Sequence, residues 1–363
     1  MSRHARDDNV PLNADATSSR DLALEVENLR TVFHTEHEQI HAVDGISFNI
    51  RRGETVGLVG ESGSGKSVTA RSILGLIESP GEIDPASAIR FEGDNITEYT
   101  ESEYESIRGD GIAMVFQDPL STLNPVYTVG NQIKEALSLH QDLRGTAATE
   151  RAIELLEEVG IPDAARRVTE YPHQFSGGMR QRAVIAMALA CAPEVLICDE
   201  PTTALDVTIQ AQIIDLLMDI QAERDLSILF ITHDMGVIAE VADRVNVMYA
   251  GEIVESAPVE PLFAEPKHPY TRGLLRSIPS TQTSGDRLET IKGEVPTPNE
   301  PASSCRFAPR CTKSFEECSE VAPTPTAVGD DPDHDAACLL YPESMTTDEA
   351  VAHHRPADDG GEQ

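Results

Sequence analysis

A glycine-rich segment of eight residues carries the pattern of a phosphate-binding loop. It reads Gly60, Glu61, Ser62, Gly63, Ser64, Gly65, Lys66 and Ser67. Glycines let backbone N–H groups curl around a β-phosphate, where side chains would block the approach. Lys66 supplies positive charge to the β- and γ-phosphates, and the Ser67 hydroxyl can bind Mg²⁺. The segment therefore predicts a site for a nucleoside triphosphate with magnesium.

Two acidic residues predict the second half of that site. Asp199 and Glu200 directly follow the apolar residues 195–198, which predict a buried strand. In a phosphate-loop ATPase, the Asp at the end of such a strand holds Mg²⁺, and a neighbouring Glu polarises the attacking water. We therefore expect Asp199 to be the metal residue and Glu200 the base.

The elements around these residues predict an α/β protein. Residues 56–59 predict a strand before the loop, and residues from Val68 to 76 predict a helix whose N-terminal dipole faces the anion. We expect a phosphate-loop ATPase core over residues 23–262, with a helical subdomain inserted at about 118–180. A small Cys-containing C-terminal domain is expected over 263–341, and disorder is expected over 1–22 and in the acidic tail at 342–363.

A further motif resembles a known family. Ser176, Gly177 and Gly178, followed by Met-Arg-Gln-Arg, resemble the signature motif of ATP-binding cassette ATPases. Ser176 is predicted to cap a helix whose N-terminus can bind phosphate. The resemblance implies that this terminus binds the γ-phosphate of ATP held by a partner subunit. Two chains would then enclose two ATP molecules.

The resemblance assigns roles to four more residues. Gln117 matches the glutamine that touches Mg²⁺ and the attacking water. Asp206 matches the loop that crosses the dimer interface, and His233 matches the switch histidine that contacts the γ-phosphate. Phe33 is the candidate for stacking on adenine, and a core phenylalanine is the alternative.

Four segments resemble one subgroup, the ATPases of oligopeptide, dipeptide and nickel importers. They are residues 117–125, 175–182, 266–275 and 305–311. The resemblance implies a peripheral protein at the cytoplasmic face of the cell membrane that couples ATP hydrolysis to uptake of oligopeptides or dipeptides. Nickel or another small solute is the alternative, and a soluble cassette ATPase outside transport is a remote one. The implied partners are a paralogous ATPase subunit or a second copy, two membrane-spanning permease subunits and an extracellular solute-binding protein.

Four cysteines fall in the proline-rich C-terminal region, with 5, 6 and 19 residues between successive members. They are Cys305, Cys311, Cys318 and Cys338. Four thiolates can hold one iron–sulfur cluster or one zinc ion, and a loop-rich region needs such a cross-link. The family resemblance favours a four-iron four-sulfur cluster, while zinc and free thiols stay open.

The strongly negative net charge excludes some classes of function. The 363 residues include 28 Lys and Arg against 62 Asp and Glu, a net charge of −34. Such a charge argues against nucleic-acid binding, which needs basic surfaces. The acids are spread along the whole chain, which favours adaptation to a high-salt cytoplasm, where salt screens their repulsion. The polar first 20 residues do not predict a secretory signal, and no apolar stretch approaches the ~20 residues that span a bilayer.

Overall fold

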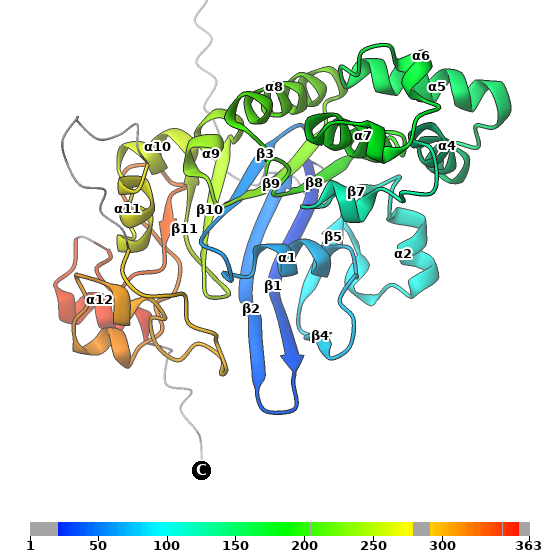
Figure 1. Ribbon diagram of the computed structural model, residues 1–363. Coiled ribbons are helices and arrows are strands. Elements are labelled where there is room, and N and C mark those ends of the chain that lie inside the picture. Colours follow the sequence, from blue (N-terminus) through cyan, green and yellow to red (C-terminus); the bar gives the residue numbers. More distant parts are fainter. Residues whose placement is uncertain (1–20, 204, 279–290, 343, 356–363) are drawn as a thin grey trace, which may run out of the picture.

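The computed structural model describes residues 21–203, 205–278, 291–342 and 344–355 (Figure 1). Most of the N-terminal segment expected to be disordered, residues 1–20, lies outside these ranges. The end of the expected acidic tail, residues 356–363, also lies outside them.

The larger sheet has the strand order β12-β13-β11-β10-β3-β9-β8-β7, and its strands from β10 to β7 are parallel. These parallel strands are β10 (Arg244–Tyr249), β3 (Thr55–Val59), β9 (Ser227–Thr232), β8 (Val195–Asp199) and β7 (Ile112–Val115). Helices cover one face, and α1 (Lys66–Ile73) together with a second, smaller sheet covers the other, which explains why β3, β8 and β9 are buried along their whole length. The carboxyl ends of parallel strands meet at one edge, so the loops that follow β3, β7, β8 and β9 converge there.

The smaller sheet is antiparallel, with the order β2-β1-β5-β6 and with β4 paired to β1. Its strands are β1 (Leu22–His34), β2 (Gln39–Arg51), β4 (Gly81–Ile83), β5 (Ala88–Phe91) and β6 (Asp94–Asn95). The helices of this part are α1 (Lys66–Ile73), η2 (Ile96–Glu98) and α2 (Glu101–Ile107). One apolar cluster joins the smaller sheet, α1 and residues of the larger sheet such as Leu58 and Ile231. This cluster fixes α1 between the two sheets.

Helices fill the chain between β7 and β8. They are α3 (Pro119–Thr122), α4 (Val129–His140), α5 (Gly145–Glu158), α6 (Ala164–Arg167), η3 (Pro172–Gln174) and α7 (Gly177–Leu189). A second apolar cluster packs this group and the helices α8 (Val207–Arg224) and α9 (Met235–Val241) against the larger sheet. Figure 1 shows α4 to α7 gathered at one end of the molecule. None of the helices in the described ranges is long and apolar enough to cross a membrane.

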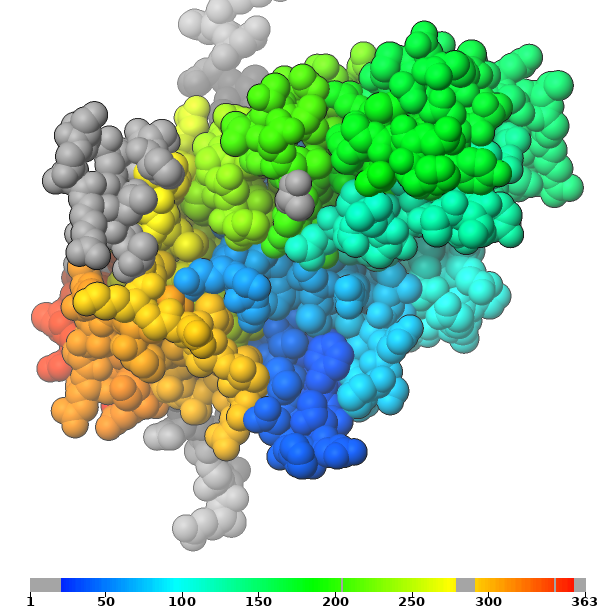
Figure 2. Space-filling view, in the orientation of Figure 1, coloured from blue at the N-terminus to red at the C-terminus, as the bar shows by residue number. Residues whose placement is uncertain are grey.

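The C-terminal region packs on the free edge of β10. Its elements are β11 (Glu252–Pro258), α10 (Val259–Ala264), α11 (Pro269–Arg276), η5 (Ala308–Arg310), η6 (Glu316–Ser319), β12 (Thr326–Ala327), β13 (Asp335–Ala336) and α12 (Thr347–His354). Strand β13 pairs with β11 and so continues the larger sheet. Figure 2 shows the yellow and orange part of this region beside the blue N-terminal strands, where Asn299 donates a hydrogen bond to Glu38.

Helix α12 lies inside the segment that we expected to be disordered, so that expectation is wrong for residues 347–354. A capping box explains why the helix forms: Thr346 accepts from the N–H of Glu349, whose carboxylate accepts from the N–H of Thr346. Val351 packs with Cys318 and Leu339 in a small apolar cluster. This contact holds the helix on the C-terminal region.

Candidate active site

The phosphate-binding loop joins β3 to α1, and its backbone is crowded. A Cβ on Gly60 would lie 2.1 Å from the carbonyl oxygen of Met248, and one on Gly65 would lie 2.2 Å from that of Ala42. Gly65 also has a φ of 107°, in the region that favours glycine. These two positions therefore require glycine, which lets the loop backbone pack closely against Met248 and Ala42.

Lys66 begins α1 and turns back over the loop. Its Nζ donates hydrogen bonds to the carbonyl oxygens of Gly60, at 2.7 Å, and Glu61, at 3.0 Å. Burial lowers the pKa of Lys66, and the negative charges of Glu200, Asp199 and Glu61 oppose that effect. The ammonium group thus lies where the loop would enclose a phosphate.

The Ser67 hydroxyl donates a hydrogen bond to Asp199 Oδ1 at 3.0 Å. Asp199 is the last residue of β8 and is buried, and this burial raises the pKa of its carboxyl. A hydroxyl and a carboxylate in contact are the oxygen ligands that Mg²⁺ takes in proteins, often together with phosphate oxygens. The two residues therefore fit the magnesium site predicted for them.

Glu200 is the centre of a hydrogen-bonded group at the carboxyl ends of three strands. Its Oε2 accepts from Gln117 Nε2 at 3.1 Å and from Thr203 Oγ1 at 2.8 Å, and its Oε1 lies 3.2 Å from His233 Nδ1. Burial raises the pKa of Glu200, but the hydrogen bonds from Thr203 and His233 outweigh burial, so that the pKa lies below its ordinary value. Glu200 is therefore ionised near neutral pH.

The backbone of Glu200 is strained. Its φ is 49°, in the left-handed region that a residue with a side chain rarely adopts. Such conformations cost free energy and persist where the surroundings hold them. Here the N–H of Glu200 donates to the carbonyl of Ile231 in the neighbouring strand β9. In this conformation the carboxylate meets Gln117, Thr203 and His233.

Sequence reasoning missed Thr203. Its hydroxyl holds Glu200 from three residues further along the chain. The signal was available in the sequence, because a threonine three residues after a turn carboxylate can close a short local ring of hydrogen bonds.

The predicted signature residues form a helix terminus. Ser176 caps α7 by accepting a hydrogen bond from the N–H of Met179 at 3.3 Å. A Cβ on Gly178 would lie 2.6 Å from Cγ2 of Ile209, whereas one on Gly177 would meet only Leu205, at 3.8 Å. Asp206 caps the adjacent helix α8 through the N–H of Ile209. The starts of α7 and α8 therefore pack against each other.

Phe33 lies near the end of β1, half-buried, opposite Ile40 and Gly81 in the smaller sheet. Val68 lies on α1 against the cluster between the sheets. Within the described ranges, no hydrogen bond joins Ser176 or Asp206 to the group around Glu200. The hydrogen bonds instead link one pair of predicted residues, Ser67 with Asp199, and one group of three, Glu200 with Gln117 and His233.

Comparisons with known proteins agree with this geometry. The sequence profile described as "ABC transporter" matches residues 43–203, and that described as "Oligopeptide/dipeptide transporter, C-terminal region" matches residues 254–318. The oligopeptide transport ATP-binding protein AppD of Bacillus subtilis is 54% identical over 295 residues, which cover 81% of this chain and 90% of AppD. The chain belongs to the ABC transporter family.

Other members of the ABC family extend the comparison. The putative peptide import ATP-binding protein BAB2_1052 of Brucella abortus is 53% identical over 302 residues, which cover 83% of this chain and 90% of that protein. The solved dimer of the ATP-binding cassette MJ0796 with ADP and Pi has a TM-score of 0.59 and 27% identity, and covers 65% of this chain and 98% of that one. The solved structure of the cassette cbiO1 from Clostridium perfringens has a TM-score of 0.58 and 29% identity, and the match covers 68% of this chain and 92% of cbiO1. The expected ATPase fold is confirmed, and this ABC protein is an ATPase.

The four C-terminal cysteines of this ABC protein lie in one region. The N–H of Cys305 donates to the carbonyl of Cys318, and Cys311 follows η5. Burial raises the pKa of the Cys305 thiol to about 12 and that of Cys338 to about 11, and neighbouring thiols of the four add to both shifts. Within the part of the chain that the structure describes, no three His, Cys, Asp or Glu residues are grouped so that they could hold a metal ion.

Proposed function

We propose that this chain is the ATP-hydrolysing subunit of an importer of oligopeptides or dipeptides, bound to the cytoplasmic face of the membrane. The proposal rests on two features found together in one chain. One is the arrangement of Lys66, Ser67, Asp199 and Glu200, and the other is the match of residues 254–318 to the oligopeptide/dipeptide transporter region. The names of AppD and BAB2_1052 support the peptide substrate.

The geometry supports a role for each residue in hydrolysis. Ionised Glu200 would orient the attacking water and accept its proton, while Gln117 and His233 hold the carboxylate. Lys66 and the loop N–H groups would bind the β- and γ-phosphates. Ser67 and Asp199 would hold Mg²⁺, which neutralises phosphate charge when bound. Phe33 is the proposed surface for adenine.

A second chain would complete each site. The N-termini of α7 and α8, with Ser176, Gly177, Gly178 and Asp206, are capped and glycine-lined and can approach a phosphate closely. The solved MJ0796 cassette is dimeric. We therefore propose that this chain pairs with a paralogous subunit or a second copy, so that the signature terminus of one chain meets the nucleotide of the other.

The surface near Gln117 supports contact with membrane-spanning permease subunits. A groove of about 340 Å³ lies between the core and the helical group, with Leu74, Phe116, Ala136, Val184 and Met187 in its largely apolar lining. Beyond it, side chains of large apolar residues are exposed: Leu120, Val126 and Tyr127. Nucleotide-dependent movement of Gln117 would therefore reach a permease docked there. An extracellular solute-binding protein would supply the solute.

We also propose that this chain binds a four-iron four-sulfur cluster through Cys305, Cys311, Cys318 and Cys338. The location of all four cysteines in one loop-rich region supports it, and because burial raises the pKa values of Cys305, Cys311 and Cys338, metal binding by these three thiols would release protons. The cluster would cross-link the segments around η5 and η6, because Cys311 follows η5 and Cys318 lies in η6. Zinc or free thiols are the alternatives.

An uptake assay tests the proposal. The gene is deleted in its host, and uptake of a radiolabelled tripeptide and of radioactive nickel is followed with and without complementation by the wild type or by Glu200→Gln. Peptide uptake that is lost on deletion and restored only by the wild type is expected. Loss of nickel uptake alone would select the alternative solute, and unchanged uptake of both would contradict the importer proposal.

A further inference from the structure

The second residue of the phosphate-binding loop is held by the C-terminal region. Both carboxylate oxygens of Glu61 accept hydrogen bonds from the guanidinium of Arg310, from Nη1 at 2.6 Å and from Nη2 at 3.0 Å. The backbone N–H of Glu61 donates to the hydroxyl of Tyr270 at 2.9 Å. Arg310 ends η5 and Tyr270 lies in α11, so two separate C-terminal elements reach one loop residue.

Arg310 is itself fixed in place. Its Nε donates to the carbonyl of Lys292 at 2.9 Å and its Nη2 to that of Gly293 at 3.0 Å. Its guanidinium lies 5.6 Å from the ring centre of Tyr249, and its side chain is 6% exposed. A paired, planar and largely buried guanidinium loses little freedom when it binds a carboxylate. The arginine therefore holds Glu61 in one position.

Tyr270 is equally constrained. Its ring is fully buried and packs on Tyr249, with ring centres 4.7 Å apart, and on Phe307, at 5.3 Å. Its hydroxyl cannot move without disturbing this aromatic group. The Tyr270 hydroxyl is thus a rigid acceptor that fixes the position of the Glu61 backbone N–H.

The contacts bear directly on phosphate binding. The carbonyl of Glu61 accepts from Lys66 Nζ, so the backbone of this residue connects Tyr270 to the phosphate-binding lysine. The Glu61 carboxylate would repel a bound triphosphate if it were unpaired, and in a partly buried site that repulsion is weakly screened. Arg310 neutralises this charge by pairing with the carboxylate.

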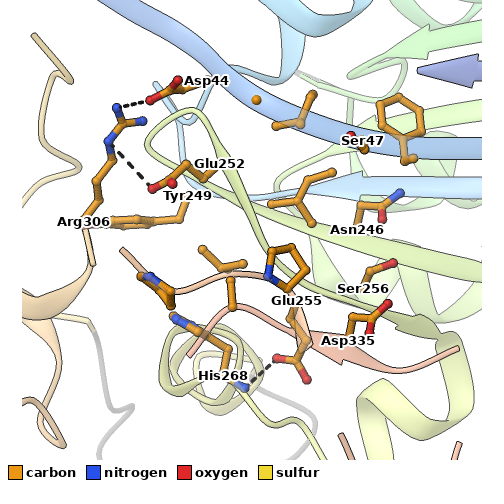
Figure 3. A pocket seen from close by; sticks show the side chains of 18 of the residues that line it. Asp44, Ser47, Asn246, Tyr249, Glu252, Glu255, Ser256, His268, Arg306 and Asp335 are labelled. Carbon is orange, nitrogen blue, oxygen red and sulfur yellow. Dashed lines mark hydrogen bonds and ion pairs between the residues drawn. The ribbon is translucent and has the colours of Figure 1, made fainter. Parts of the chain in front are cut away.

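The segment that carries Arg310 is also anchored at its other end. Arg306 donates to the carbonyl of Ala250 at 2.6 Å and to Asp44 at 2.6 Å, and lies 3.7 Å from Glu252. Figure 3 shows Arg306 between these two acids, above a cavity of about 430 Å³ between β2, β11 and the C-terminal region. Among the described residues, Arg306 forms no hydrogen bond or ion pair with the phosphate-binding loop, which makes it a matched control.

We infer that Arg310 and Tyr270 are positioning residues for ATP: they hold the phosphate-binding loop in its binding conformation and neutralise Glu61. The inference rests on the proposed nucleotide site. It predicts that these two residues govern ATP affinity and KM, while kcat depends on the untouched residues around Glu200.

The test is a mutant cycle on the purified full-length chain. Dissociation constants for MgATP are measured by titration calorimetry, and KM and kcat by phosphate release, for Arg310→Ala, Arg310→Lys, Glu61→Gln and the double variant Glu61→Gln/Arg310→Ala. Arg310→Ala should weaken binding roughly tenfold because it leaves a carboxylate unpaired, and Arg310→Lys should restore part of the affinity. Tyr270→Phe should weaken binding about threefold through the lost backbone contact.

The cycle separates positioning from simple loss of folding. In the Glu61→Gln background, Arg310→Ala should cost at most about half as much, in free energy, as in the wild type, because no charge is left to neutralise. Arg306→Ala, which loosens the same segment, should keep the wild-type affinity in protein that is still folded by circular dichroism. An equal loss in both backgrounds, or an Arg310→Ala affinity equal to the wild type, would overturn the inference. A wild-type protein that binds no ATP would instead overturn the proposed function.

Discussion

His233 Nδ1 lies 3.2 Å from Glu200 Oε1, although 33 residues separate the two in sequence. The neighbouring parallel strands β8 and β9 end immediately before Glu200 and His233, so the sheet brings the two side chains together. Gln117 reaches the same carboxylate from the end of β7. A carboxylate held by three strand ends is preorganised to receive a proton, since it need not reorient when the water attacks the γ-phosphate.

Replacing Glu200 by Gln should therefore separate binding from chemistry. The amide keeps the shape and the contact with Thr203, but it cannot accept a proton. We expect ATP affinity close to that of the wild type and turnover reduced by about 10² to 10⁴. Calorimetry and phosphate release measure the two quantities. Unchanged turnover would remove Glu200 as the base.

The two signature glycines should respond differently to alanine. At Gly178 a methyl group would collide with Cγ2 of Ile209, and overpacking of this kind costs about 1 to 3 kcal/mol. At Gly177 there is room, and the higher helix propensity of alanine should offset any loss. Urea unfolding of both variants measures the free energies. A loss at Gly178 as small as that expected at Gly177 would show that Ile209 moves to accommodate the methyl group.

Acid should destabilise the fold partly through His268. Burial, aided by Arg272 and opposed by Glu255, lowers the pKa of His268 to about 4, and its Nδ1 accepts from the N–H of Tyr270. Between pH 6.5 and 4 the unfolded chain binds a proton at this residue that the folded chain does not. Its contribution to stability is complete above pH 6.5 and is lost as the pH falls toward 4, by at most about 3 kcal/mol.

The control for that effect is His268→Asn, because asparagine caps a helix well and does not titrate. The free energy of unfolding should fall less steeply with decreasing pH in this variant than in the wild type. Parallel curves between pH 6.5 and 4 would mean that His268 is not the group responsible.

Metal analysis decides among the possibilities for the cysteines. Protein purified without air should contain iron and sulfide in stoichiometric amounts and show broad visible absorption. Cys311→Ser should lose both, while Cys191→Ser, at the end of α7 and outside the C-terminal region, should lose neither. A colourless protein with one zinc ion, or with none, would contradict the cluster.

Salt should stabilise this chain if its acidity is an adaptation to high salt. With a net charge of −34, repulsion falls as the Debye length shortens from about 10 Å at 0.1 M to about 3 Å at 1 M. The midpoint of thermal unfolding should rise most steeply within that range of KCl and then level off. A flat profile from 0.1 to 1 M would argue against the interpretation.

The features that could be predicted from the sequence are those with a local sequence pattern. The phosphate-binding loop and Asp199 at the end of its strand are short motifs whose residues lie within a few positions of one another, so the order of residue types predicts them. The contact of Glu61 with Arg310 joins residues 249 positions apart and has no local signature. Helix α12 did have one, the capping box at Thr346 and Glu349, but the polar, acidic composition around it favoured disorder.

The pairing of β13 with β11 bears on where the chain can be cut. A fragment ending at residue 262, near the expected end of the cassette, would leave the backbone groups of Glu255 and Ser256 unpaired on an outer strand. Exposed strand edges of this kind recruit other chains and promote aggregation. Such a fragment would also lose Tyr270 and Arg310. The residues after 262 therefore cover an exposed strand edge of the ATPase, and a chain that includes them is the appropriate unit for expression and crystallisation.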